Sequence, residues 1–150
     1  MPTNDLSSPF HVLIADDYFA FAQILAMGLE SYSEGRLRCD LCDDGANALH
    51  RLRNEHYDIL LTDLNMVPMN GLDLINEVRL DSNLRHLPTV VISGHLEPLE
   101  ARRAIQFGVQ AMLCKPASIR KVWVTVARVL RINLSGMGSE GDYRGGASLH

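Results

Sequence analysis

The sequence predicts an α/β fold in which a doubly wound, five-stranded parallel sheet carries helices on both faces. Five apolar runs of strand length alternate with five segments of helical periodicity along the chain. The apolar runs are rich in Val, Ile and Leu and lack a polar side, which is typical of parallel strands buried on both faces. With 150 residues, 47% of them hydrophobic, the chain is long enough for one full core, which we place at residues 10–131.

Each expected strand ends where polar, glycine or proline residues interrupt an apolar run. Pro88 can begin the fourth run, because the first position of a strand needs no backbone donor. The five runs are FHVLIADD (10–17), LRCDLCD (37–43), YDILLTD (57–63), PTVVISG (88–94) and AMLCKP (111–116).

Each expected helix repeats its apolar residues every three or four positions. The first is expected to close on Gly35, since glycine favours helix C-caps. The fourth has Pro98 near its first turn and Gly108 just past its end, the usual placement of these residue types. Right-handed crossovers between parallel strands then place the helices above and below the sheet. The five segments are YFAFAQILAMGLESYSEG (18–35), DDGANALHRLRNEHY (43–57), GLDLINEVRLD (71–81), EPLEARRAIQFG (97–108) and SIRKVWVTVARVLR (118–131).

The last helix is expected to turn an apolar side to the core and a basic side to solvent. Its apolar side holds Ile119, Val122, Val126 and Val129, and its basic side holds Arg120, Lys121, Arg128 and Arg131. Residues 102–131 contain seven Lys or Arg residues and no acid, although the whole chain has a net charge of −4. Seven basic residues on a chain that is acidic overall are too few for a typical basic nucleic-acid-binding domain. We therefore expect a protein-docking face or a solvated surface, and no direct nucleic-acid binding.

The sequence gives no sign of membrane insertion or secretion. No apolar stretch reaches the roughly 18 residues that a membrane span needs. The first residues, MPTNDLSSPF, lack the basic and then apolar pattern of a signal peptide. We therefore expect a soluble cytoplasmic protein. Residues 1–9 are expected to be disordered, and the Gly- and Ser-rich residues 132–150 to form a flexible tail or a truncated linker.

The three cysteines do not predict a zinc site or a disulfide framework. Cys39 and Cys42 form a C-x-x-C pair on the expected second strand, where an offset of three points two side chains to opposite faces. Cys114 is far away in the sequence. We expect all three to be small core residues.

Polar side chains mark the ends of four of the expected strands. Asp16 and Asp17 end the first, Asp63 the third, Ser93 the fourth and Lys115 the fifth. In an open parallel sheet, ligands bind beyond the carboxyl ends of the strands, where the winding direction reverses. We therefore expect these five side chains to lie together at one edge of the sheet.

This set of residue types suits phosphoryl transfer. Three converging carboxylates would repel one another, and Mg²⁺ would relieve the repulsion while keeping room for water and phosphate oxygens. Lys115 and Ser93 would add an ammonium group and a hydroxyl donor, and a carboxylate oxygen would attack the phosphorus. Taken singly, the residues also fit milder roles, because Asp16 and Asp17 suit a helix N-cap and Lys115 a solvated strand end.

In this order and at these spacings, the residues resemble the receiver domain of bacterial two-component response regulators, over about residues 10–131. The resemblance implies a flavodoxin-like (βα)5 fold with strand order 2-1-3-4-5. It implies a signalling switch that takes a phosphoryl group from a histidine kinase or histidine phosphotransfer protein. Such a protein is not an ordinary enzyme, because it catalyses only its own phosphorylation and dephosphorylation.

The resemblance also implies roles for single residues of the site. Asp63 matches the phosphoacceptor, which is also a ligand of the Mg²⁺ ion. Asp17 matches a direct metal ligand, Asp16 a carboxylate that acts through water, and Asn65 the residue whose backbone carbonyl completes the metal shell. The Lys115–Pro116 peptide bond matches one that is cis in the family.

Further implied roles concern the switch. Ser93 matches the hydroxyl that moves toward the phosphate, and Lys115 the lysine that pairs with it. Phosphorylation is then expected to reshape the surface of the fourth helix, fifth strand and fifth helix, where a downstream protein or an output domain docks, and to allow a phosphorylation-dependent dimer. The partner-surface residues are Arg102, Arg103, Arg120 and Lys121.

The sequence departs from the family pattern at two positions. Val67 stands between Met66 and Pro68, where the family usually has Met followed directly by Pro, so the loop after Asp63 is expected to take a different turn. Met112 stands where an aromatic switch residue is usual. A flexible thioether fills a cavity without committing to one of two rotamers.

Two other functions fit parts of the pattern. The first is a receiver-like binding module that works without phosphate, which the two departures allow. The second is a Mg²⁺-dependent phosphatase with an aspartyl intermediate. That class of enzyme requires a second aspartate two positions after the nucleophile, where this chain has Asn65, and an inserted cap that the sequence lacks.

Overall fold

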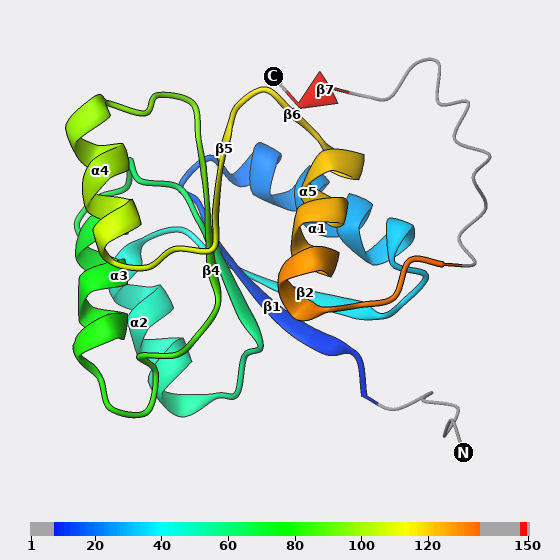
Figure 1. Ribbon diagram of the computed structural model, residues 1–150, viewed down its shortest axis with the longest axis horizontal. Coiled ribbons are helices and arrows are strands. Elements are labelled where there is room, and N and C mark those ends of the chain that lie inside the picture. The colour runs from blue at the N-terminus through cyan, green and yellow to red at the C-terminus, as the bar shows by residue number, and fades with distance from the viewer. Residues whose placement is uncertain (1–7, 136–147, 150) are drawn as a thin grey trace.

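The structure, a computed structural model, describes residues 8–135 and 148–149. Five parallel strands form one sheet in the order β2-β1-β3-β4-β5, which confirms the predicted topology (Figure 1). Because every pairing in this sheet is parallel, all five carboxyl ends lie at the same edge. The strands are β1 (Phe10–Ala15), β2 (Leu37–Cys42), β3 (Ile59–Thr62), β4 (Thr89–Ser93) and β5 (Ala111–Cys114).

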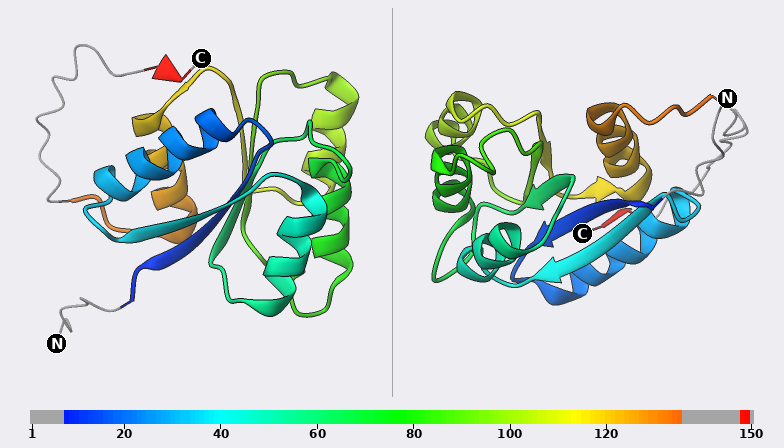
Figure 2. Two further views of the ribbon diagram at one scale, coloured as in Figure 1. Left: turned by 180° about the vertical axis from the view of Figure 1, so that it is seen from behind. Right: turned by 90° about the horizontal axis from the view of Figure 1, so that it is seen from below.

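Five helices cover the two faces of the sheet (Figures 1 and 2). α1 (Phe19–Tyr32) and α5 (Ile119–Leu130) pack side by side on one face. On the other face α2 (Gly45–Asn54), α3 (Gly71–Leu80) and α4 (Pro98–Gln106) follow one another. The chain moves from β1 outward to β2 and then crosses back to β3, so the winding direction reverses between β1 and β3.

Strand β1 shows why the apolar runs lack a polar side. Val12 and Ile14 belong to the core between the sheet and helices α1 and α5, whereas Leu13 and Ala15 belong to the core on the α2 and α3 side. All four residues are at most 2% exposed. A smaller cluster beneath α3 and α4 consists of Leu64, Ile75, Val91 and Ala104. Ala104 is the one residue of α4 that is buried.

Three helices begin after a residue that caps them, and the first helix ends earlier than predicted. Asp44, Asn70 and Ser118 cap α2, α3 and α5, each accepting a hydrogen bond from the backbone amide three residues later. α1 ends at Tyr32, three residues before the expected Gly35. Gly35 has a φ of 82° and completes the turn after the helix, where its lack of a Cβ makes the left-handed conformation accessible.

The expected tails fall mostly outside the described residues, because 1–7, 136–147 and 150 lie beyond them. In the part that is described, Ile132 and Leu134 pack against the core beneath α1 and α5. Strand β7 (Ser148–Leu149) pairs antiparallel with β6 (Ala117–Ser118), which directly follows the fifth strand and its proline. Over the described part of the chain, every helix is too short or too polar to cross a membrane.

The side chain of Arg79 joins two loops at the end of the sheet opposite the carboxyl ends. Its guanidinium donates hydrogen bonds to the carbonyl oxygens of Phe107 at 2.6 Å and Leu87 at 2.9 Å. Longer bonds of 3.3 and 3.4 Å reach the carbonyl oxygens of Arg85 and Gly108. Arg79 thus ties the residues just after α4 to the segment that leads into β4.

Replacing Arg79 with methionine should lower the free energy of unfolding by about 1 to 3 kcal/mol, because partly buried carbonyl groups lose their donors. Urea denaturation of both proteins measures the difference. The matched control is Arg85→Met, since Arg85 is exposed on the neighbouring turn and contributes only its backbone carbonyl. Equal stability losses in the two variants would contradict the assigned role.

Candidate functional site

The structure brings the polar residues at the strand ends together at the carboxyl edge of the sheet. Asp16 and Asp17 directly follow β1, Asp63 directly follows β3, Ser93 is the last residue of β4 and Lys115 directly follows β5. One carboxylate oxygen from each aspartate lies within 4.8 Å of the other two. The site therefore lies where the winding direction of the sheet reverses.

Lys115 lies at the centre of this cluster. Its Nζ donates hydrogen bonds to Asp16 Oδ2 at 2.8 Å and to Asp63 Oδ2 at 3.0 Å, and it lies 4.1 Å from the centre of the Phe21 ring. Burial alone would lower the pKa of Lys115, but its hydrogen bonds and charge interactions with the two aspartates raise the pKa overall. The ammonium group is therefore held in its charged form.

Asp16 is the most deeply buried carboxylate of the three, with 2% of its side chain exposed. Burial raises its pKa, and this effect outweighs the opposing hydrogen bonds from Lys115 and from the backbone amide of Tyr18. Asp17, by contrast, is exposed. The cluster thus carries three carboxylates against one ammonium group, an excess of negative charge that a cation would balance.

Both carboxylate oxygens of Asp63 have hydrogen-bond donors. Oδ1 accepts from the Ser93 hydroxyl at 3.0 Å and from the Asn65 backbone amide at 3.1 Å, while Oδ2 accepts from Lys115. The side-chain amide of Asn65 lies 3.5 Å from Ser93 Oγ. Asp63 is 7% exposed, so the end of the buried strand carries a negative charge that neighbouring donors satisfy.

The backbone of Asp63 is fixed as firmly as its side chain. Its amide donates to the carbonyl of Ala15 at 2.9 Å, and its carbonyl accepts from the buried Thr62 hydroxyl at 2.8 Å. The hydroxyl of Thr62 and the ring of Phe21 escaped the sequence analysis as parts of the site. Phe21 lies in the first expected helix, but its place beneath Lys115 follows from the packing of α1 against the sheet.

Exposed apolar side chains at the beginning of α1 and in the loop after β3 also escaped the sequence analysis. Tyr18 is 58%, Phe19 61% and Val67 78% exposed, and they follow Asp17 and Asp63 closely in the chain. A usable signal was present: YFAFA has more consecutive apolar residues than one face of a helix can bury. These residues form what we call the apolar rim, defined as Tyr18, Phe19 and Val67.

The structure describes the residues at both departures from the family pattern, as well as the proline bond after Lys115 and the expected partner surface. The Lys115–Pro116 peptide bond is cis, as the resemblance implied, and the Val67–Pro68 bond is cis as well. Met112 is partly buried and packs against the cluster beneath α3 and α4.

The expected partner-surface residues are all exposed. They are Arg102 and Arg103 on α4 and Arg120 and Lys121 on α5.

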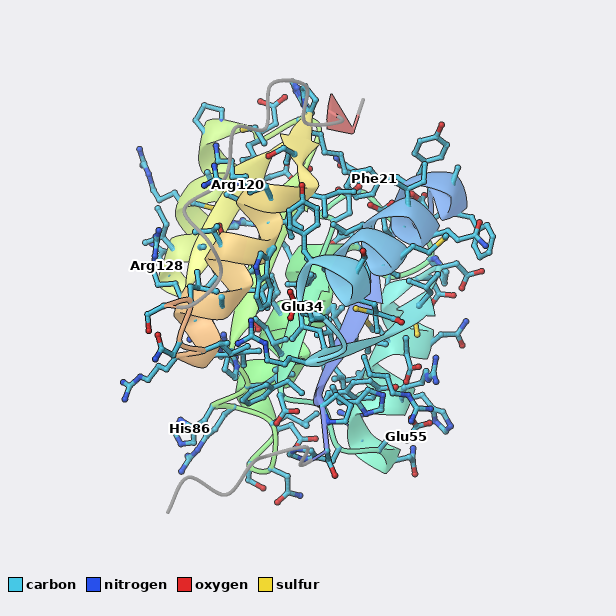
Figure 3. All side chains as sticks on the ribbon, turned by 90° about the vertical axis from the view of Figure 1, so that its right-hand side faces the viewer. Phe21, Glu34, Glu55, His86, Arg120 and Arg128 are labelled. Carbon is cyan, nitrogen blue, oxygen red and sulfur yellow. The ribbon has the colours of Figure 1, made fainter. Side chains whose placement is uncertain are left out.

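A groove separates β5 from the basic side of α5. It has a volume of about 500 Å³, and Met112, Arg120, Lys121 and Arg128 contribute to its lining. Figure 3 shows Arg120 and Arg128 on the outer side of α5. The basic side predicted for this helix is therefore at the surface, next to an edge strand of the sheet.

The three aspartates fit a hard divalent cation. Carboxylate oxygens are the ligands that Mg²⁺ prefers, and it needs only one or two of them besides water. Among the described residues, these aspartates are the one group of three or more acidic, histidine or cysteine side chains close enough to share an ion. Cys39 and Cys42 pack on opposite sides of the sheet, as their spacing predicted. The expectation that all three cysteines are core residues is wrong for Cys114, which is exposed at the end of the edge strand β5.

Comparison with known proteins gives one consistent family. The family model described as the response regulator receiver domain matches residues 12–127. The chemotaxis protein CheY of Pseudomonas aeruginosa is 31% identical over 123 residues, which cover 81% of this chain and 98% of that protein. The sensory/regulatory protein RpfC of Xanthomonas campestris is 35% identical over 119 residues, but these span only 16% of its length.

A solved structure agrees with these matches. The response regulator receiver protein from Pseudomonas putida superimposes with a TM-score of 0.74 and 28% sequence identity, covering 81% of this chain and 98% of that one.

Replacing Asp17 with asparagine should leave the metal-free protein as stable as the wild type, or up to about 1 kcal/mol more stable, because it removes one of three repelling charges at an exposed position. Millimolar Mg²⁺ should raise the melting temperature of the wild type, since a ligand of the native state stabilises it, and should raise that of the variant much less. Differential scanning fluorimetry measures both effects. Asp73→Asn, an exposed substitution in α3, should keep the full response to Mg²⁺; a full response in Asp17→Asn would contradict a shared metal site.

Proposed function

The chain belongs to the response regulator receiver domain family, and on this premise we propose that it is a phosphorylation-dependent switch with Asp63 as the phosphoacceptor. The family consists of signalling proteins rather than classical enzymes. The observation that carries the proposal is the setting of Asp63, a buried carboxylate whose oxygens accept from Ser93, Asn65 and Lys115. These donors hold an ionised nucleophile at the open edge of the sheet.

The proposed reaction transfers a phosphoryl group to a side chain that is already ionised. A carboxylate oxygen of Asp63 attacks the phosphorus, forming a P–O bond while the P–N bond to the donor histidine breaks. No general base is needed, because a carboxylate has no proton to lose when its oxygen attacks. Once phosphate is bound, the Ser93 hydroxyl and the Lys115 ammonium group are the donors placed to meet its oxygens.

We assign Asp16, Asp17, Asp63 and the backbone carbonyl of Asn65 to holding Mg²⁺. When bound, the ion would neutralise charge on the phosphoryl oxygens. Asp16 is bonded to Lys115 at 2.8 Å, which supports an indirect role for this carboxylate, whereas the exposed Asp17 is free to serve as a direct ligand.

The apolar rim supports a protein as the phosphodonor. A donor histidine must approach Asp63 from the open edge, so its protein must cover the side chains that surround the site. Tyr18, Phe19 and Val67 are exposed in the segments that follow Asp17 and Asp63, and their apolar surface would be covered by a protein that docks over the site. A histidine kinase or histidine phosphotransfer protein is the partner that fits this surface.

The output is proposed to use the surface of α4, β5 and α5. A phosphoryl group adds nearly two negative charges and three acceptor oxygens, which would draw Ser93 and Lys115 toward it. Ser93 ends β4, residues 94–97 join it to α4, and Lys115 directly follows β5, so their movement would reach the basic surface that contains Arg102, Arg103 and Arg120. A downstream protein, an output domain or a second copy of the chain would dock there.

Incubation with Mg²⁺ and acetyl phosphate should add one acid-labile phosphoryl group to the wild-type chain. Asp63→Asn should remove this modification entirely, because the amide is not a nucleophile for phosphorus. Intact-protein mass spectrometry at several times gives the answer. Asp73→Asn should be labelled like the wild type, and undiminished labelling of Asp63→Asn would exclude Asp63 as the acceptor.

Beryllium fluoride, a mimic of the phosphoryl group, should change the surface of α4, β5 and α5 in the presence of Mg²⁺. We expect altered hydrogen exchange in peptides that contain Met112 and Arg120, together with a larger mass in light scattering if the surface pairs two copies. Asp63→Asn is the control that should not respond. Normal binding of beryllium fluoride with unchanged exchange in these peptides would refute the proposed switch surface.

A further inference from the structure

Two glycines brace the loop that follows Asp63, which comprises residues 64–70. Gly71 begins α3, and its amide donates to the carbonyl of Leu64 at 3.0 Å. A Cβ atom added at Gly71 would lie 2.0 Å from the carbonyl oxygen of Asp63. The start of α3 therefore packs directly against the backbone of the phosphoacceptor, at a distance that a side chain would prevent.

Gly45 makes a corresponding contact from a different part of the chain. It begins α2, and its amide donates to the carbonyl of Met69 at 3.0 Å. A Cβ atom at this position would lie 2.6 Å from the carbonyl oxygen of Met69 and 2.8 Å from its Cγ atom. Space, and not a positive φ, requires glycine here. For helix propensity alone, alanine would be the better residue by about 1 kcal/mol.

The second half of the loop, residues 67–70, has fewer buried side chains than α2. The first turn of α2 is held by the Asp44 cap, and the helix is anchored by the buried Ala48, Leu49 and Leu52. In the loop, Leu64 and Met66 are buried in the core, whereas Val67 and Pro68 are exposed and Met69 is only partly buried. A side chain at position 45 would therefore push the loop away from α2 more readily than it would displace the helix.

Displacement of the loop reaches the site through Asn65. The backbone amide of Asn65 donates to Asp63 Oδ1 at 3.1 Å, and its side-chain amide lies 3.5 Å from Ser93 Oγ. We propose that Gly45 is a positioning residue for the phosphoacceptor, acting through its backbone contact with Met69 to set the loop and thereby Asn65. The consequence for the metal rests on the proposed function, which gives the Asn65 carbonyl to Mg²⁺.

The test compares two identical substitutions in the full chain. Gly45→Ala should shift the NMR resonances of the Leu64 and Asn65 amides in the metal-free protein, and should weaken Mg²⁺ binding roughly tenfold, as is typical when the support of a ligand is lost. The matched control is Gly28→Ala in α1, where the three atoms nearest to the added Cβ all belong to the side chain of Ile119. This control should lower the melting temperature and leave the Asn65 amide and the Mg²⁺ affinity unchanged.

A second variant separates positioning from loss of the fold. In Gly45→Ala combined with Met69→Gly, two of the three close contacts are removed, so Mg²⁺ affinity should recover at least in part. An unchanged Asn65 amide in folded Gly45→Ala, or an equal loss of Mg²⁺ affinity in Gly28→Ala, overturns the proposal. The amide shifts are measured without metal or phosphate, so they decide the role of Gly45 even if Asp63 proves not to be phosphorylated.

Discussion

The site depends on the ion pairs that Lys115 makes with Asp16 and Asp63 across the edge of the sheet. These groups arrive from the ends of three strands and bury most of their charge, and each would be costly to bury alone. The lysine lets two carboxylates remain close, while the third, Asp17, stays in contact with water. The buried carboxylates have hydrogen-bond donors, but the cluster keeps a net negative charge. It is therefore well suited to attract a cation and then a phosphoryl group.

The fold supplies this arrangement through the burial of the strands. Side chains that alternate between two cores bury both faces of the sheet, and the helices between the strands return the chain so that all five strands run in one direction. The first residues beyond the strands therefore emerge at a single edge. Asp63 combines both requirements, because its backbone is bonded within the sheet while its carboxylate faces the edge. The strongest constraint on the proposed chemistry is therefore set by β3, which leads into Asp63 and has no charged residue of its own.

Much of this organisation can be predicted from the sequence, because it follows from periodicity and from the common direction of parallel strands. The sheet order came from the family resemblance, and the meeting of Asp16, Asp63, Ser93 and Lys115 from the rule for strand ends. Features that depend on contacts between distant elements were not predicted. Phe21 beneath Lys115 depends on how α1 lies on the sheet. The end of α1 before Gly35 and the pairing of β6 with β7 likewise follow from the folded chain.

Because α4 is anchored by few buried side chains, we expect this helix to open locally before the core strands do. With a single buried alanine, this helix contributes little apolar area to either core, and Arg79 secures only the backbone just beyond its end. Segments with few buried contacts open locally at a small fraction of the global unfolding free energy. A modest local input of energy can therefore move α4 while the rest of the sheet stays intact, which confines the mechanical cost of any rearrangement to one corner of the protein.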